Sequence, residues 1–161
     1  MFDKIGFLVR LWELMARHTM VGDSLSGTES LELLSLMQLV TDDFRMPEPG
    51  SCARPPDAVP AHLIGEGAIA AGEVRYVCAA ALLAASARAM TPGAAVIVRL
   101  TDTARGIEYA LPCVVAWVHE GKPCIMAFVV DGVPTRTDFS LPPEAVESGS
   151  SGGASQLRSI E

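Results

Sequence analysis

The sequence predicts an α+β fold, mainly β, in which a pair of N-terminal helices precedes a small β-domain. Apolar residues recur at helical spacing between Phe2 and Val40, and the proline-rich stretch at 46–60 ends that pattern. Beyond Val74 the apolar residues are instead continuous or alternate with a period of two, which indicates strands. The C-terminus is polar and rich in Ser and Gly, a composition typical of a disordered tail. We therefore expect a two-helix segment at 1–45, a linker at 46–60, a β-domain at 61–140 and a tail at 141–161.

The first helix is expected over Phe2–Arg17. Its apolar side chains form two stripes at steps of three and four: Ile5, Leu8, Trp12 and Met15 on one, and Phe7, Leu11 and Leu14 on the other. Two stripes on one short helix indicate cover from more than one side, by the rest of the fold or by a partner. We expect Trp12 to face the core, and we take Phe7, Leu11 and Leu14 as candidate contacts with a protein partner or with a second copy of the chain.

The second helix begins at a capping box, Ser26-Gly27-Thr28-Glu29. The Ser26 hydroxyl can accept a hydrogen bond from a free backbone amide, while the Glu29 carboxylate reaches back to the amide of Ser26. Apolar residues then cover more than half of the helix circumference, and the helix is expected to end before Pro47.

One strand is expected over Val74–Ala85, where the chain is continuously apolar. The alanines at 79–85 also suit a helix, so that part of the segment could adopt either structure. A strand that is apolar on both faces needs a second covering layer, for which the two helices are the candidates. Thr91-Pro92-Gly93 is expected to be a turn, and the next strand alternates Val96, Val98 and Leu100 with Ile97 and Arg99.

A β-hairpin is expected from Ile107 to the Asp131-Gly132 turn. In its first strand, six side chains share one face: Ile107, Tyr109, Leu111, Cys113, Val115 and Trp117. A two-residue turn at Glu120-Gly121 would pair His119 with Lys122, Trp117 with Cys124 and Cys113 with Phe128. Cys113 and Cys124 would then lie about 13 Å apart, at ~3.3 Å per residue, beyond disulfide reach. We therefore expect both cysteines to be small core side chains.

The composition excludes several functional classes. The chain has 12 basic residues, only two of them lysines, against 19 acidic ones, and a nucleic-acid polymer is not an expected partner because its phosphates need clustered positive charge. No apolar run reaches the ~20 residues of a membrane helix, and the N-terminus lacks the features of a signal peptide. The four cysteines are scattered, and the three histidines have no metal-ligand spacing. We expect a reduced, cytoplasmic protein without membrane insertion, metal or cofactor.

Two short motifs suggest chemistry that their context does not support. Gly22-Asp23-Ser24-Leu25 matches the GDSL string of a hydrolase family, but it lies between helices and no later Asp-x-x-His follows. A serine without a base is not activated, so these residues are expected to shape the interhelical turn. Gly65-Glu66-Gly67 suggests a phosphate loop but lacks the strand-to-helix context, which favours a β-turn. With no nucleophile–base pair, we expect no enzyme activity.

The stretch from about Arg54 to Arg136 resembles a PilZ domain, best known as a bacterial receptor for the second messenger cyclic di-GMP. The resemblance is carried by the segment 74–85, by MTPGAAVIVRL ending at Leu100, and by LPCVVAWV running into HEGKPCIMAFV. It covers about half of the chain. The resemblance implies a small six-stranded β-barrel, to which this chain adds an N-terminal helical pair.

The ligand motifs of that family are mostly lost. PilZ receptors are similar in using Arg-x-x-x-Arg before the barrel and Asp/Asn-x-Ser-x-x-Gly on the first long strand. Arg54 matches one arginine, and Ala58 stands where the other would be. Tyr76, Cys78 and Ala81 stand where the resemblance places the Asp or Asn, the Ser and the Gly. Each lost charged hydrogen bond costs about 1.5–3 kcal/mol, so cyclic di-GMP is not expected to bind in the usual mode.

We therefore expect a degenerate PilZ-like adaptor that acts through protein–protein contacts. The resemblance implies a role in bacterial motility, in type IV pili or in a surface-polysaccharide system. The alternative is a cyclic di-GMP receptor with a non-standard site, which would need Arg75, Arg88 or Arg99 to converge in space.

Overall fold

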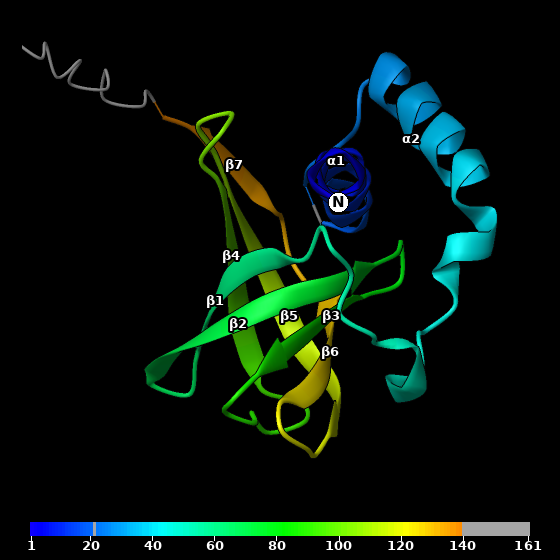
Figure 1. The fold of residues 1–161 in the computed structure, drawn as a ribbon. Coiled ribbons are helices and arrows are strands. Elements are labelled where there is room, and N and C mark those ends of the chain that lie inside the picture. The colour runs from blue at the N-terminus through cyan, green and yellow to red at the C-terminus, as the bar shows by residue number, and fades with distance from the viewer. Residues whose placement is uncertain (21, 140–161) are drawn as a thin grey trace, which may run out of the picture.

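The computed structural model describes residues 1–20 and 22–139, and these form two helices followed by a closed β-barrel (Figure 1). The expected tail at 141–161 lies outside the described residues. The helices are α1 (Phe2–Thr19) and α2 (Gly27–Leu39), and two short 3-10 turns, η1 (Thr41–Phe44) and η2 (Pro49–Ser51), lead to the first strand. The predicted capping box starts α2, because the Glu29 amide donates to Ser26 Oγ at 3.2 Å and the Ser26 amide donates to Glu29 Oε2 at 2.9 Å.

Seven antiparallel strands follow one another along the chain: β1 (Val59–Gly65), β2 (Ala68–Val77), β3 (Leu82–Ser86), β4 (Ala95–Asp102), β5 (Ile107–His119), β6 (Cys124–Val130) and β7 (Thr135–Asp138). Their order in the sheet is β4-β1-β2-β3-β6-β5-β7, and pairing of β4 with β5 closes a barrel of six strands. β7 is an additional strand on β5. The predicted α+β class with a six-stranded barrel is thus confirmed, although β1 begins at Val59, within the expected linker.

Helix α1 lies across one end of the barrel, and α2 packs on the opposite side of α1 (Figure 1). Trp12 Nε1 donates to the Ala79 carbonyl at 2.9 Å, and a Cβ on Gly6 would lie only 3.1 Å from the Tyr109 hydroxyl. The residues of both apolar stripes of α1 are buried or partly buried within the described chain. Trp12 is buried, as the sequence predicts.

The expected single strand at 74–85 is wrong, because the chain reverses direction within it. β2 ends at Val77, a tight turn spans 78–81, and β3 begins at Leu82. The Cys78 amide donates to the Ala81 carbonyl at 3.0 Å, which closes the turn. The turn contains no Gly, Pro or Asn; helix α1 and the segment after α2 hold it from outside, so no local signal marks it.

The β5–β6 hairpin has a different register from the predicted one. Its loop runs over 120–123 and contains a cis Lys122–Pro123 bond, so His119 pairs with Ile125 and Cys113 with Val130. Pro123 lacks the amide that a two-residue turn would have used for pairing. A bulge between Val115 and Trp117 also reverses the alternation. Trp117 therefore lies outside the barrel, and Val118 packs against the core in its place.

The remaining local predictions hold. β1 and β2 are joined by a two-residue turn in which Glu66 and Gly67 have φ of 51° and 72°, so this glycine-containing segment is a β-turn. Cys113 and Cys124 are buried and free, as expected of small core side chains. Val96, Val98 and Leu100 point into the barrel, and Ile97 and Arg99 point out.

Candidate functional site

The positions at which the resemblance would place the ligand motif lie at the β2–β3 turn and offer little polar surface. Tyr76, next to the end of β2, lies on the outer face with 38% of its surface exposed, and the Lys4 ammonium lies 5.8 Å from its ring centroid. Cys78 and Ala81 are 1% and 0% exposed, inside the turn. The side chains at the last two positions are therefore not accessible from the surface.

The backbone of this turn is also occupied. The Ala79 carbonyl accepts from Trp12 Nε1, and the Ala80 amide donates to the Asp43 carbonyl at 3.2 Å. The Cys78 thiol lies 3.8 Å from the Arg45 carbonyl. These groups satisfy polar atoms that would otherwise be available to a bound molecule.

Arg54, the remaining match to the arginine motif, lies in a hollow of about 300 Å³ beside β2 and β3. Its guanidinium donates to both oxygens of Glu73, with Nε at 2.9 and 3.0 Å, and Arg75 Nε donates to the same carboxylate at 3.0 Å. The hydrogen bond from Arg54, together with that from Arg75, lowers the pKa of Glu73 below its usual value. Glu73 is therefore ionised at neutral pH, and the cluster carries one net positive charge instead of two.

The other arginines proposed for a non-standard site do not join this cluster. Arg99 lies on β4, two strands away from β2, and donates to Glu108 at 2.8 Å. Arg88 follows β3, and its charge influences Glu66. Hydrogen bonds from Thr91 are the main cause of the lowered pKa of Glu66, and the positive charge of Arg88 lowers that pKa more weakly. Of the expected set, the structure thus brings Arg75 alone to Arg54.

The expected contact surface on α1 is wrong. Leu11 and Leu14 have no exposed surface, and Phe7 is partly buried against the core. Both faces of α1 are covered because the barrel and α2 lie on opposite sides of it. A helix pattern shows that two faces are buried but does not show whether the chain itself covers both.

An exposed apolar surface lies instead on the outside of the barrel. Ile64 pairs with Ile69 on one side and with Ile97 on the other, and Ile97 pairs with Pro112. Directly paired residues share a face of the sheet, so these four side chains form one row across β2, β1, β4 and β5. Ile69 and Ile97 are 68% and 43% exposed. We call this row the barrel row; its outward residue Ile97 was visible in the alternation of the sequence, but its neighbours across the sheet were not.

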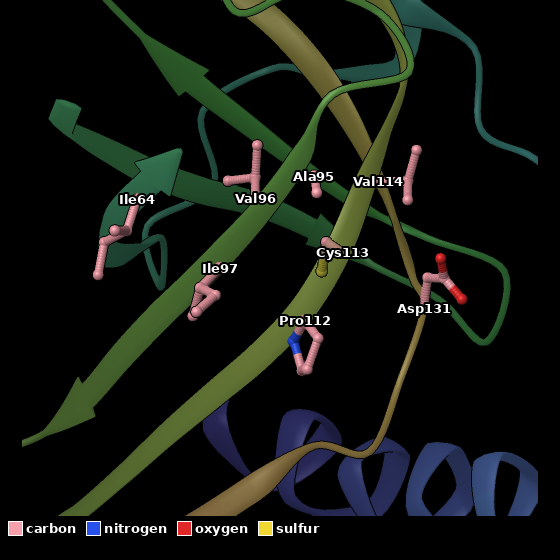
Figure 2. Close-up of a pocket in the computed structure, with 8 residues that line it drawn as sticks. All are labelled: Ile64, Ala95, Val96, Ile97, Pro112, Cys113, Val114 and Asp131. Atoms are coloured by element: carbon pink, nitrogen blue, oxygen red, sulfur yellow. The ribbon is translucent and has the colours of Figure 1, made fainter. Parts of the chain in front are cut away.

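A shallow hollow of about 310 Å³ adjoins the barrel row, with Ile64 and Ile97 on one side and Asp131 on the other (Figure 2). Cys113, which is buried, also lines it. Burial raises the pKa of the Cys113 thiol to about 12, so the thiol is protonated at neutral pH and is a poor nucleophile. The hollow is therefore an apolar surface feature without an activated group.

Helix α2 carries a second exposed apolar surface, which the sequence analysis did not identify. Leu31 and Leu34 are 68% and 59% exposed, whereas Leu33 packs inward.

The GDSL string lies between α1 and α2. Its Asp23 accepts a hydrogen bond from Arg17 Nε at 3.1 Å, which is consistent with its expected role in the interhelical turn.

Within residues 1–20 and 22–139, no three His, Cys, Asp or Glu side chains are grouped closely enough to hold a metal ion. No helix in the same part of the chain is both long and apolar enough to cross a membrane. Comparison with protein-family models and with curated proteins found no match for this chain.

Proposed function

We propose that this chain is a non-catalytic PilZ-like adaptor, which acts through protein–protein contacts in a bacterial motility, pilus or surface-polysaccharide system. In this proposal it resides in the cytoplasm and does not bind cyclic di-GMP in the family's usual mode. The observation that carries the proposal is the Arg54–Glu73–Arg75 cluster. An internal carboxylate occupies both guanidinium groups beside the strand on which a PilZ receptor would hold its ligand.

Charge supports this interpretation. Cyclic di-GMP carries two phosphates, whereas the cluster offers one net positive charge in a chain whose net charge is −7. A phosphate could displace the Glu73 carboxylate, since exposed ion pairs are weak. The displaced carboxylate would nevertheless remain beside the phosphate and repel it. Cys78 and Ala81 lie buried nearby and cannot supply the missing polar contacts.

The exposed apolar surfaces support the second half of the proposal. An aligned row of outward side chains on a barrel, continuous with a hollow, is typical of a surface that another protein covers. The backbone polar groups of the β2–β3 turn form hydrogen bonds within the chain. A partner that binds the barrel row would leave these hydrogen bonds intact.

The alternative function is a cyclic di-GMP receptor with a non-standard site. One observation favours it: Arg54 and Arg75 converge on a hollow large enough to accept a guanine or a phosphate group. In this alternative, the bound nucleotide displaces the Glu73 carboxylate from Arg54 and Arg75.

Isothermal titration with cyclic di-GMP separates the two functions. The adaptor predicts no binding by the wild-type chain in the submillimolar range. Submillimolar binding that Arg54→Ala abolishes would overturn it. Glu73→Gln removes the competing charge, and Glu108→Gln, which breaks the comparable pair with Arg99 two strands away, is the matched control. Binding gained by Glu73→Gln alone would identify the carboxylate as the group that keeps the nucleotide out.

Site-specific photo-crosslinking in the bacterial host tests the proposed protein–protein contact through the barrel row. A photoreactive residue at Ile97, in the barrel row, is compared with one at Thr103, which is also exposed but lies on a polar turn. The adaptor predicts a discrete crosslinked protein from position 97 that position 103 does not give. Identical patterns at both positions would contradict a contact through the barrel row.

A further inference from the structure

We propose that two copies of this chain pair through the outer faces of their α2 helices, running antiparallel about a two-fold axis. This deepens the proposed function, because it rests on an action through protein contacts and names a second copy as one partner. The observations behind it are the spacing, the charge and the exposure of the residues on α2.

The outer face of α2 has the spacing of a helix-pairing seam. Its residues recur at steps of four, three and four: Gly27, Leu31, Leu34 and Gln38. This is the spacing at which one helix packs along another. The inner face is different, because Leu33 and Val40 are buried there against the rest of the chain. Leu31 and Leu34 on the outer side are exposed, and within residues 1–20 and 22–139 no other element lies over that side (Figure 1).

The seam is uncharged, which favours a second copy as its occupant. The two carboxylates of α2 turn toward α1, where Glu29 pairs with Arg17 and Glu32 with Arg10, each at 2.7 Å. No charged side chain lies among the seam residues. A partner with the same net charge of −7 therefore meets no like charge at the contact, and the surface offers no charge that would select a different protein.

Antiparallel pairing fits this seam best. It places Leu31 of each copy opposite Leu34 of the other at the centre, and Gln38 opposite Gly27 toward the ends. Nothing lies within 4 Å of the position where a Gly27 Cβ would be, so the glycine leaves room for a facing side chain. The antiparallel arrangement also sets each helix N-terminus beside the C-terminus of the other, which aligns the helix dipoles favourably.

The expected interface is small. Thirteen residues make a helix about 20 Å long, and the hollow of about 260 Å³ beside Leu34, Met37 and Phe44 adds a limited area. Such a contact falls at the low end of specific interfaces, so we expect a reversible dimer that forms in the micromolar range.

Sedimentation velocity over a wide micromolar range tests the pairing with the full chain. We expect a concentration-dependent dimer, and a dissociation constant raised at least about tenfold by Leu31→Lys or by Leu34→Glu. Leu39→Lys is the matched control, since Leu39 is 75% exposed on the same helix but lies outside the seam. Circular dichroism checks that each variant remains folded; the substituted leucines are exposed, so folding should be retained.

Mixing the two variants tests the direction of the pairing. In an antiparallel pair, the lysine of Leu31→Lys meets the glutamate of Leu34→Glu, so the mixture should dimerise again although each variant alone does not. A chain that stays monomeric at every concentration, or a dimer that ignores both seam variants, would overturn the inference. Failure of the mixture to dimerise would overturn the antiparallel arrangement. Nucleotide binding, by contrast, would overturn the proposed function and leave the pairing intact.

Discussion

Trp12→Phe should loosen the attachment of α1 to the barrel by a measurable amount. The substitution keeps an aromatic ring in the core but removes Nε1, which donates to the Ala79 carbonyl at 2.9 Å. Ala79 is 5% exposed, so its carbonyl would be left buried without this donor. Leaving a buried polar group unpaired costs about 1–3 kcal/mol of unfolding free energy, and the smaller ring adds a packing loss in the same direction.

Urea denaturation followed by circular dichroism measures this loss. With a slope of about 1–3 kcal/mol per molar urea, the midpoint should fall by roughly 1 M. Trp117→Phe is the control, since Trp117 lies on the outer face of the barrel and its loss should move the midpoint much less. An unchanged midpoint in Trp12→Phe, within the error of the extrapolation, would show that this hydrogen bond does not hold the β2–β3 turn.

Three further predictions concern other parts of the chain. Gly65→Ala should destabilise the barrel by about 1–3 kcal/mol in the same urea assay, because the new Cβ would lie 2.9 Å from the Ala95 carbonyl; an unaltered midpoint would contradict this. The hydrogen bond from Arg17 lowers the pKa of Glu29 to about 2 from 4.5. The ionised Glu29 carboxylate should therefore stabilise the folded chain fully above pH 4.5, and this stabilisation should be lost as the pH falls toward 2. Melting temperatures of the wild-type chain and Glu29→Gln should therefore converge at the acid end and differ near neutrality. Iodoacetamide followed by mass spectrometry should modify Cys52 first in the native chain, because the other three cysteines are buried; equal labelling of all four would refute the buried positions.

The parts of the fold that the sequence predicted correctly are those with local signals. The capping box at Ser26 and the alternation of β4 each depend on residues close together in the chain. The β2–β3 turn was missed because a tryptophan indole 67 residues away and the Asp43 carbonyl hold it. The bulge beside Trp117 was missed for a related reason: one extra residue moves every later side chain to the other face and leaves no mark in the composition.

The candidate site shows the same division. The replacements at Tyr76, Cys78 and Ala81 are visible in the sequence, once the resemblance places them. The ion pair between Arg54 and Glu73 is not visible in the sequence, because its two residues lie 19 positions apart, one in the linker and one on β2. The seam on α2 was present in the sequence as a run of leucines, but its spacing became informative only when Leu33 was seen to face inward.

The position of α1 determines the order in which this chain can complete its fold. The helix is synthesised before the groups that surround it on the barrel side: the β2–β3 turn near Ala79, the Tyr109 hydroxyl, and the segment around Val130, which lines a hollow together with Trp12 and Met15. Until β6 has left the ribosome, the barrel-facing side of α1 has no complete barrel to pack against. Packing of α1 against the completed barrel therefore requires β6, and a nascent chain stalled before Val130 exposes apolar residues of α1, such as Ile5 and Leu8, that have no exposed surface in the folded chain.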